Sequence, residues 1–135
     1  YMLVGHPTMA WNIPAKIQTY QWDADKKKLP MIANPDFLAQ VKEIFKPEDT
    51  ILVICRSGGR SAQAVNLLAD AGFKHAYSIT GGMEGDVVYD PESVFHGKRM
   101  KNGWKNSGLP WTCDLDPEQM RLPAVQKPAP ATKPE

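Results

Sequence analysis

Residues 51–61 read Ile-Leu-Val-Ile-Cys-Arg-Ser-Gly-Gly-Arg-Ser, an apolar run that leads directly into a cysteine, two arginines and two glycines. The continuous β-branched and aliphatic run predicts a strand that is covered on both faces. The two glycines at 58–59 let the backbone curl tightly enough to direct its N–H groups inward, toward the sulfur. The stretch therefore predicts a buried strand, an anion-binding turn and a helix, in that order.

The helix is expected over residues 61–71, where apolar side chains recur at helical spacing until Gly72. Its positive end, together with Arg56 and Arg60, should favour Cys55 as a thiolate, the form that performs nucleophilic chemistry. The alternative is that Cys55 is a small apolar residue that closes a strand. A structural cysteine needs neither two guanidinium groups nor two glycines beside it, so the sequence favours the nucleophile.

Strands and helices alternate along the rest of the chain. The expected elements are a short strand at 10–13, a helix at 35–45, a strand at 50–54, the helix at 61–71 and a strand at 76–79. Asn34 is a suitable N-cap for the first helix, and residues 16–31 are expected to form a solvated surface excursion. This alternation predicts parallel βαβ units and therefore an α/β fold.

The loop at residues 55–61 resembles the active-site loop of the rhodanese (sulfurtransferase) family, especially that of its single-domain members. Residues 75–85, His-Ala-Tyr-Ser-Ile-Thr-Gly-Gly-Met-Glu-Gly, are similar to the segment that follows the active-site helix in this family. Gly5-His6 and residues 10–14 resemble the two ends of a further family motif, although residues 7–9 depart from it. The resemblance implies a rhodanese-like parallel sheet flanked by helices.

The resemblance also implies that N-terminal strands of this fold are missing. Rhodanese domains carry, before the Gly-His motif, a strand that lies centrally beside the cysteine-bearing strand, and a shorter strand before that. We therefore expect residues 1–116 to form an N-terminally incomplete rhodanese-like domain, so that the chain is a fragment or something else fills the gap. Residues 117–135 are rich in proline and are expected to be an extended C-terminal tail.

The chemistry that the resemblance implies is sulfur transfer through Cys55. The thiolate would attack the outer sulfur of a donor such as thiosulfate and hold it as a persulfide until cyanide, a thiol or a protein acceptor removes it. The residues expected to bind the substrate are those of the loop, Arg56, Ser57, Gly58, Gly59, Arg60 and Ser61. Arg56 is the favoured substrate contact because it lies at the open start of the loop, whereas Arg60 could equally hold the shape of the loop.

Two other functions stay open. The same loop could serve a non-turnover sulfur carrier, or a persulfide-sensing module that interacts with a protein partner. Phosphatase or arsenate reductase activity ranks behind both, because four residues separate Cys55 from Arg60, and cysteine-dependent phosphatases of related fold have a loop one residue longer.

The composition narrows the choice of partners. The 135 residues include 16 basic and 15 acidic side chains, so the net charge gives no reason to expect nucleic acid or a membrane surface. The two cysteines and three histidines lack the spacing of metal ligands, and we expect no metal or other cofactor. Cys113 is expected to be a bystander thiol, or else a second thiol that caps the persulfide as a disulfide. The long 16–35 connection resembles that of exported bacterial proteins and favours the periplasm, with the cytoplasm as the alternative.

Overall fold

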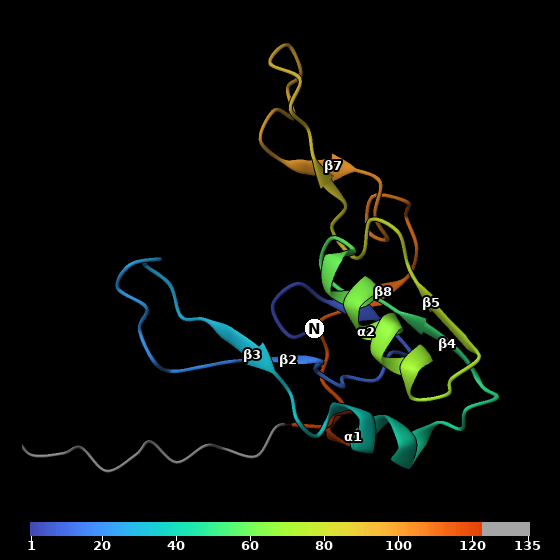
Figure 1. Ribbon diagram of the computed structural model, residues 1–135. Helices are drawn as coiled ribbons and strands as arrows, with labels where there is room; N and C mark the ends of the chain where they lie inside the picture. The colour runs from blue at the N-terminus through green and yellow to red at the C-terminus, as the bar shows by residue number, and fades with distance from the viewer. Residues whose placement is uncertain (123–135) are drawn as a thin grey trace, which may run out of the picture.

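The computed structural model describes residues 1–122, which combine two helices with short strands (Figure 1). The elements are β1 (His6–Pro7), β2 (Lys16–Gln18), β3 (Met31–Ala33), α1 (Phe37–Ile44), β4 (Thr50–Val53), α2 (Gly59–Asp70), β5 (His75–Ser78), β6 (Asp86–Val87), β7 (Arg99–Lys101), β8 (Trp111–Thr112) and the 3-10 helix η1 (Pro117–Gln119). The α/β class expected from the sequence is confirmed.

The β4–α2–β5 unit positions the cysteine loop. β4 and β5 pair in parallel, with Val53 opposite Ser78, and α2 is the crossover that parallel strands require. The ladder continues past the last paired residues, because the Ile79 N–H donates to the Val53 carbonyl at 2.9 Å. The carboxyl ends of both strands therefore meet at one edge, and Cys55 follows β4 at that edge.

The core lies between the two helices and one face of the β4–β5 pair. Its buried members are Phe37, Val41, Ile51, Ala64, Leu68 and Phe73. Burial of a large aliphatic or aromatic side chain stabilises the folded state by about 1.5–3 kcal/mol, and these side chains fix both ends of the cysteine loop. The loop is therefore attached to the best-packed part of the molecule.

The prediction that residues 51–54 form a strand covered on both faces is wrong. Ile51 is buried, but Leu52 is 62% exposed, and Tyr77, which pairs with Leu52 across the ribbon, is 54% exposed. The reason is that both helices contribute to the core on the Ile51 side. Within residues 1–122, β5 is the only strand that pairs with β4, and an apolar cavity of about 450 Å³ borders β4. β4 therefore has the composition of a central strand but lies at an edge.

The N-terminal third differs from the expectation in two places. No strand forms at residues 10–13, where Asn12 instead bonds the backbone of Gln119 and Arg121, each at 2.8 Å. The helix α1 begins two residues later than expected, because residues 34–37 form a turn in which the Asp36 N–H donates to the Asn34 side-chain oxygen at 3.1 Å and the Phe37 N–H donates to the Asn34 carbonyl at 3.2 Å. Residues 16–31 lie at the surface, as expected, and with residues 32–33 they form the β2–β3 hairpin, which projects from the body (Figure 1).

The boundary expected at residue 117 stays a prediction. η1 follows it directly, and the Arg121 guanidinium lies 3.3 Å from the Glu43 carboxylate of α1. The rest of the predicted tail, residues 123–135, lies outside the described residues.

Candidate active site

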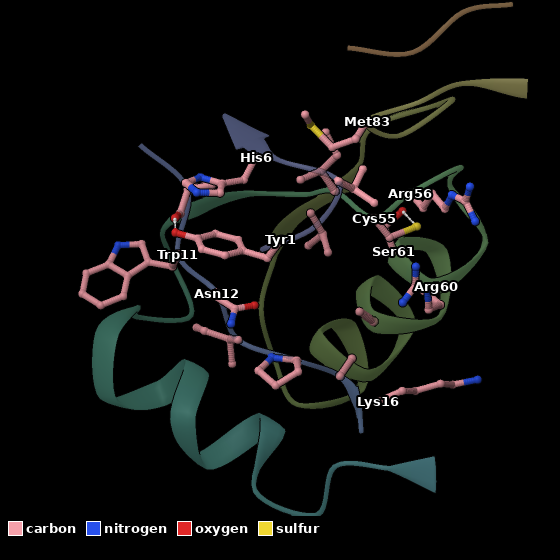
Figure 2. Close-up of a pocket in the computed structure, with 18 of the residues that line it drawn as sticks. Tyr1, His6, Trp11, Asn12, Lys16, Cys55, Arg56, Arg60, Ser61 and Met83 are labelled. Atoms are coloured by element: carbon pink, nitrogen blue, oxygen red, sulfur yellow. Dashed lines mark hydrogen bonds between the residues drawn. The ribbon is translucent and has the colours of Figure 1, made fainter. Parts of the chain in front are cut away.

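Cys55 lies on the wall of a cavity of about 300 Å³. One wall is the cysteine loop, and the opposite wall is the N-terminal segment, which contributes His6 and Asn12 (Figure 2). The thiol is partly buried. The cavity therefore has room for a small ligand beside the sulfur.

The loop backbone closes around the sulfur at Gly58. This residue has a φ of +101°, a left-handed conformation that glycine adopts without the steric cost of a side chain. Its N–H donates to Cys55 Sγ at 3.2 Å, and its carbonyl accepts from the Ala62 N–H at 3.1 Å. The same residue thus contacts the sulfur and starts α2, so the positive end of the helix lies at the thiol.

Hydrogen bonds make Cys55 acidic. Burial raises the pKa of the thiol, but the Ser61 hydroxyl and the backbone N–H groups of Ser61, Ser57 and Gly58 together outweigh burial and lower the pKa to about 7. Backbone N–H groups directed at the sulfur were expected from the sequence, whereas Arg56 and Arg60, also expected to favour the thiolate, are not among the groups that lower this pKa. The thiolate is therefore well populated near neutral pH.

The reactivity of Cys55 is therefore expected to rise through neutral pH. The rate of alkylation by iodoacetamide should be half-maximal near pH 7, because the thiolate predominates above the pKa and the thiol below it. Mass analysis of the peptide that carries Cys55 separates this rate from that of the exposed Cys113. A midpoint near 8.5, the ordinary value for a cysteine, would contradict this assignment of donors.

The two loop arginines have different partners. The Arg56 side chain runs outward from Cys55 and forms an ion pair with Glu84 (Figure 2). The Arg99 guanidinium also lies 4.0 Å from the Glu84 carboxylate. Both arginines line the cavity, but within residues 1–122 Arg60 forms neither an ion pair nor a side-chain hydrogen bond. The bonds to loop carbonyls that the sequence allowed for Arg60 are not formed. These contacts favour Arg60 over Arg56 as the residue available to an anion.

The segment at residues 81–85 supports the loop from outside. The Met83 N–H donates to the Cys55 carbonyl at 2.8 Å, and the Glu84 N–H donates to the Arg56 carbonyl at 2.9 Å. Gly82 has a φ of +59°, and a Cβ there would overlap the Cys55 carbonyl oxygen and lie 2.7 Å from the Arg56 carbonyl carbon. The glycine at position 82 therefore permits close contact between the backbone of residues 81–85 and the backbone of the cysteine loop.

Sequence reasoning gave no role to three residues that the fold brings to the site. His6 is buried, stacks on the Tyr1 ring at 3.6 Å and lies 3.0 Å from the Asp114 carbonyl, so it fixes the N-terminal wall of the cavity. Glu84 holds Arg56, and Ser78 contacts Ser61. Of the three, only Ser78 could have been placed near Cys55 from the sequence. It lies near the end of a strand expected to run parallel to the cysteine-bearing strand, and the carboxyl ends of parallel strands lie at the same edge of a sheet.

Cys113 lies exposed just after β8, and both cysteines are free thiols. Its proposed role as a disulfide cap stays a prediction. Within residues 1–122, no group of three or more His, Cys, Asp or Glu side chains could hold a metal ion. None of the helices in this part of the chain has the length and apolar character needed to span a membrane.

The sequence profile of the Rhodanese-like domain matches residues 1–87. The chain is 50% identical over 78 residues to Thiosulfate sulfurtransferase 16, chloroplastic, of Arabidopsis thaliana, an alignment that covers 58% of each protein. It is 38% identical over 79 residues to Senescence-associated protein DIN1 of Raphanus sativus, covering 58% of this chain and 39% of that protein. The chain thus spans about half the length of these relatives.

The fold has a counterpart among solved structures. The crystal structure of Rv0390 from M. tuberculosis superposes with a TM-score of 0.50 at 31% sequence identity. The superposition covers 70% of this chain and 62% of that one.

Proposed function

The chain belongs to the Rhodanese-like domain family, and from this membership we propose that it is a sulfurtransferase that works through a persulfide on Cys55. The proposed reaction moves sulfane sulfur from a donor such as thiosulfate to cyanide or a thiol. The observation that carries the proposal is the cysteine itself, a thiol with a pKa of about 7 that faces backbone N–H groups at the start of a helix. The similarity to a protein named thiosulfate sulfurtransferase supports the donor class.

The proposed reaction proceeds in two displacements. The Cys55 thiolate attacks the outer sulfur of thiosulfate, a sulfur–sulfur bond forms, and the electron pair of the donor's own sulfur–sulfur bond leaves with sulfite. The enzyme then carries the persulfide anion. Cyanide or a thiolate attacks the terminal sulfur, the bond to Cys55 Sγ breaks, and the pair returns to Cys55 as a thiolate. No general base is required, because the thiolate form of the nucleophile is already well populated near neutral pH.

The loop stabilises negative charge at both steps. The Gly58 N–H already donates to Sγ at 3.2 Å, and N–H groups fixed before the reaction need no reorganisation as charge moves to the outer sulfur. Arg60 lies on the cavity wall without a carboxylate partner, so its guanidinium is available to the sulfonate oxygens of the donor. Arg56 is proposed to act mainly through its ion pair with Glu84, which anchors the start of the loop.

Exchange of the two arginines for alanine separates these roles. Arg60→Ala is expected to raise the KM for thiosulfate by about 10- to 100-fold, the loss that accompanies one hydrogen bond to a charged group. Arg56→Ala should raise it less and should lower thermal stability more, because Glu84 loses its partner. Initial rates over a range of thiosulfate concentrations measure both effects. A larger KM increase in Arg56→Ala would return the binding role to Arg56.

The proposed activity is tested with thiosulfate as donor and cyanide as acceptor, and thiocyanate formation is followed. Continuous turnover supports the enzyme. A single equivalent of sulfur that only a particular protein can remove would instead support the sulfur carrier. Hydrolysis of an aryl phosphate is expected to be absent, since the loop has four residues between Cys55 and Arg60.

A further inference from the structure

The Ser61 hydroxyl has more acceptors than it has hydrogens. The residue is 1% exposed, and its Oγ lies 2.9 Å from the Gly58 carbonyl oxygen, 3.5 Å from Cys55 Sγ and 2.9 Å from Ser78 Oγ. A hydroxyl supplies one hydrogen and two lone pairs. The carbonyl oxygen of Gly58 only accepts, and a thiolate at Cys55 only accepts. The single hydrogen of Ser61 can satisfy only one of these two acceptors at a time.

Ser78 is placed to resolve this competition. It is the last residue of β5, opposite Val53, and within residues 1–122 its hydroxyl has Ser61 as its one side-chain partner. Whenever the hydrogen of Ser61 goes to Gly58 or to Cys55, the hydrogen between the two serines comes from Ser78. In that arrangement Ser78 donates to Ser61 whether Cys55 is a thiol or a thiolate.

We propose that Ser78 is a positioning residue that acts through Ser61, making the Ser61 hydroxyl a donor to the Cys55 thiolate. Donation into Ser61 Oγ polarises its O–H bond and strengthens the bond that Ser61 gives, as in other hydrogen-bonded chains. It also prevents Ser61 from turning its own hydrogen toward β5. Without the Ser78 hydroxyl, the Gly58 carbonyl competes better for that hydrogen, and the thiolate loses a donor.

This inference rests on the proposed function only in taking Cys55 as the nucleophile. Other charged groups also face the sulfur or its loop, and a change at position 78 alters none of them. They are Arg60 and Arg56 of the loop, Glu84 of the supporting segment, and His6, Lys16 and the Tyr1 amino group on the opposite wall. A difference in Cys55 reactivity between variants at position 78 therefore measures the effect of the hydroxyl at that position.

The test compares Ser78→Val with Ser78→Thr in a Cys113→Ser background. Valine and threonine have nearly the same shape and suit a strand, but only threonine keeps the hydroxyl. The readout is the rate of Cys55 alkylation by iodoacetamide as a function of pH, which requires no sulfur donor. Ser78→Thr should retain the midpoint near pH 7. Ser78→Val should raise it, and a rise of about one unit slows alkylation at pH 7 about fivefold.

A double-mutant cycle shows whether the effect passes through Ser61. In a Ser61→Ala background, Ser78→Val and Ser78→Thr should have the same profile, because the intermediate hydroxyl is gone. Identical profiles for the two variants in the presence of Ser61 would overturn the proposal. The proposal would also be overturned if Ser78→Val and Ser78→Thr differed in midpoint by the same amount in the Ser61→Ala background as in the presence of Ser61. If Ser78→Val does not fold, judged by circular dichroism, Ser78→Ala takes its place.

The remote Ser93→Ala variant controls for loss of a hydroxyl elsewhere, and its profile should match the unmodified chain. Thiocyanate turnover of the unmodified chain is measured in parallel. Absence of turnover together with the expected difference between Val and Thr would count against the proposed function and in favour of the Ser78 assignment.

Discussion

Cys55→Ser is expected to abolish sulfur transfer, with a loss of at least about 1000-fold in thiocyanate formation. The hydroxyl of serine is not ionised at neutral pH and cannot form a persulfide, so neither displacement can occur. The backbone should be unaffected, because serine is nearly isosteric with cysteine and the Gly58 N–H can donate to its oxygen as it does to Sγ. Thermal unfolding should therefore be close to that of the unmodified chain.

The matched control is Cys113→Ser, the same substitution at an exposed thiol. This variant should retain turnover. Loss of turnover in both variants would indicate that Cys113 takes part, as in the disulfide cap considered from the sequence. Turnover that survives in Cys55→Ser would contradict the persulfide mechanism.

The second large effect is expected for Gly82→Ala. A Cβ at this position would overlap the Cys55 carbonyl oxygen, and the φ of +59° disfavours any side chain. Overpacking against backbone and the left-handed conformation together should cost about 3 kcal/mol or more, a large part of the 5–15 kcal/mol that typically stabilises a domain. The free energy of unfolding in urea measures the loss. Any folded fraction should turn over slowly, because relief of the overlap moves the loop that carries the thiol.

Gly97→Ala separates the two causes. Gly97 has a φ of +77°, also in the left-handed region, but a Cβ there would meet nothing within 4 Å. It should lose only the conformational part, about 1–2 kcal/mol, and keep its activity. Equal losses of stability in the two variants would show that contact between residue 82 and the cysteine loop is unimportant.

Part of the site could be predicted from the sequence because it is local. A strand, a glycine-containing turn and a helix, all within residues 50–70, place Gly58 and Ser61 around the Cys55 sulfur without reference to the rest of the chain. The α/β class followed from the same alternation. The helix began two residues earlier than expected, at Gly59, because the Gly58 carbonyl already accepts from the Ala62 N–H.

The rest depends on contacts between distant segments. The ion pair between Arg56 and Glu84 spans 28 positions, and it is the contact on which the proposal of Arg60 as the anion-binding residue depends. The exposed face of β4 at Leu52 could not be predicted from composition, since an apolar run describes what a strand can bury and not which neighbours cover it. The same limit applies to Asn12, whose partners lie more than 100 residues further along the chain.

The most direct test of the account is the mass of the peptide that carries Cys55 after exposure to thiosulfate and removal of the excess donor. We expect this peptide to gain the mass of one sulfur atom, to lose it on addition of cyanide, and to show no gain in Cys55→Ser. An unchanged mass, in a chain whose Cys55 still alkylates with a midpoint near pH 7, would contradict the persulfide and with it the proposed sulfur transfer.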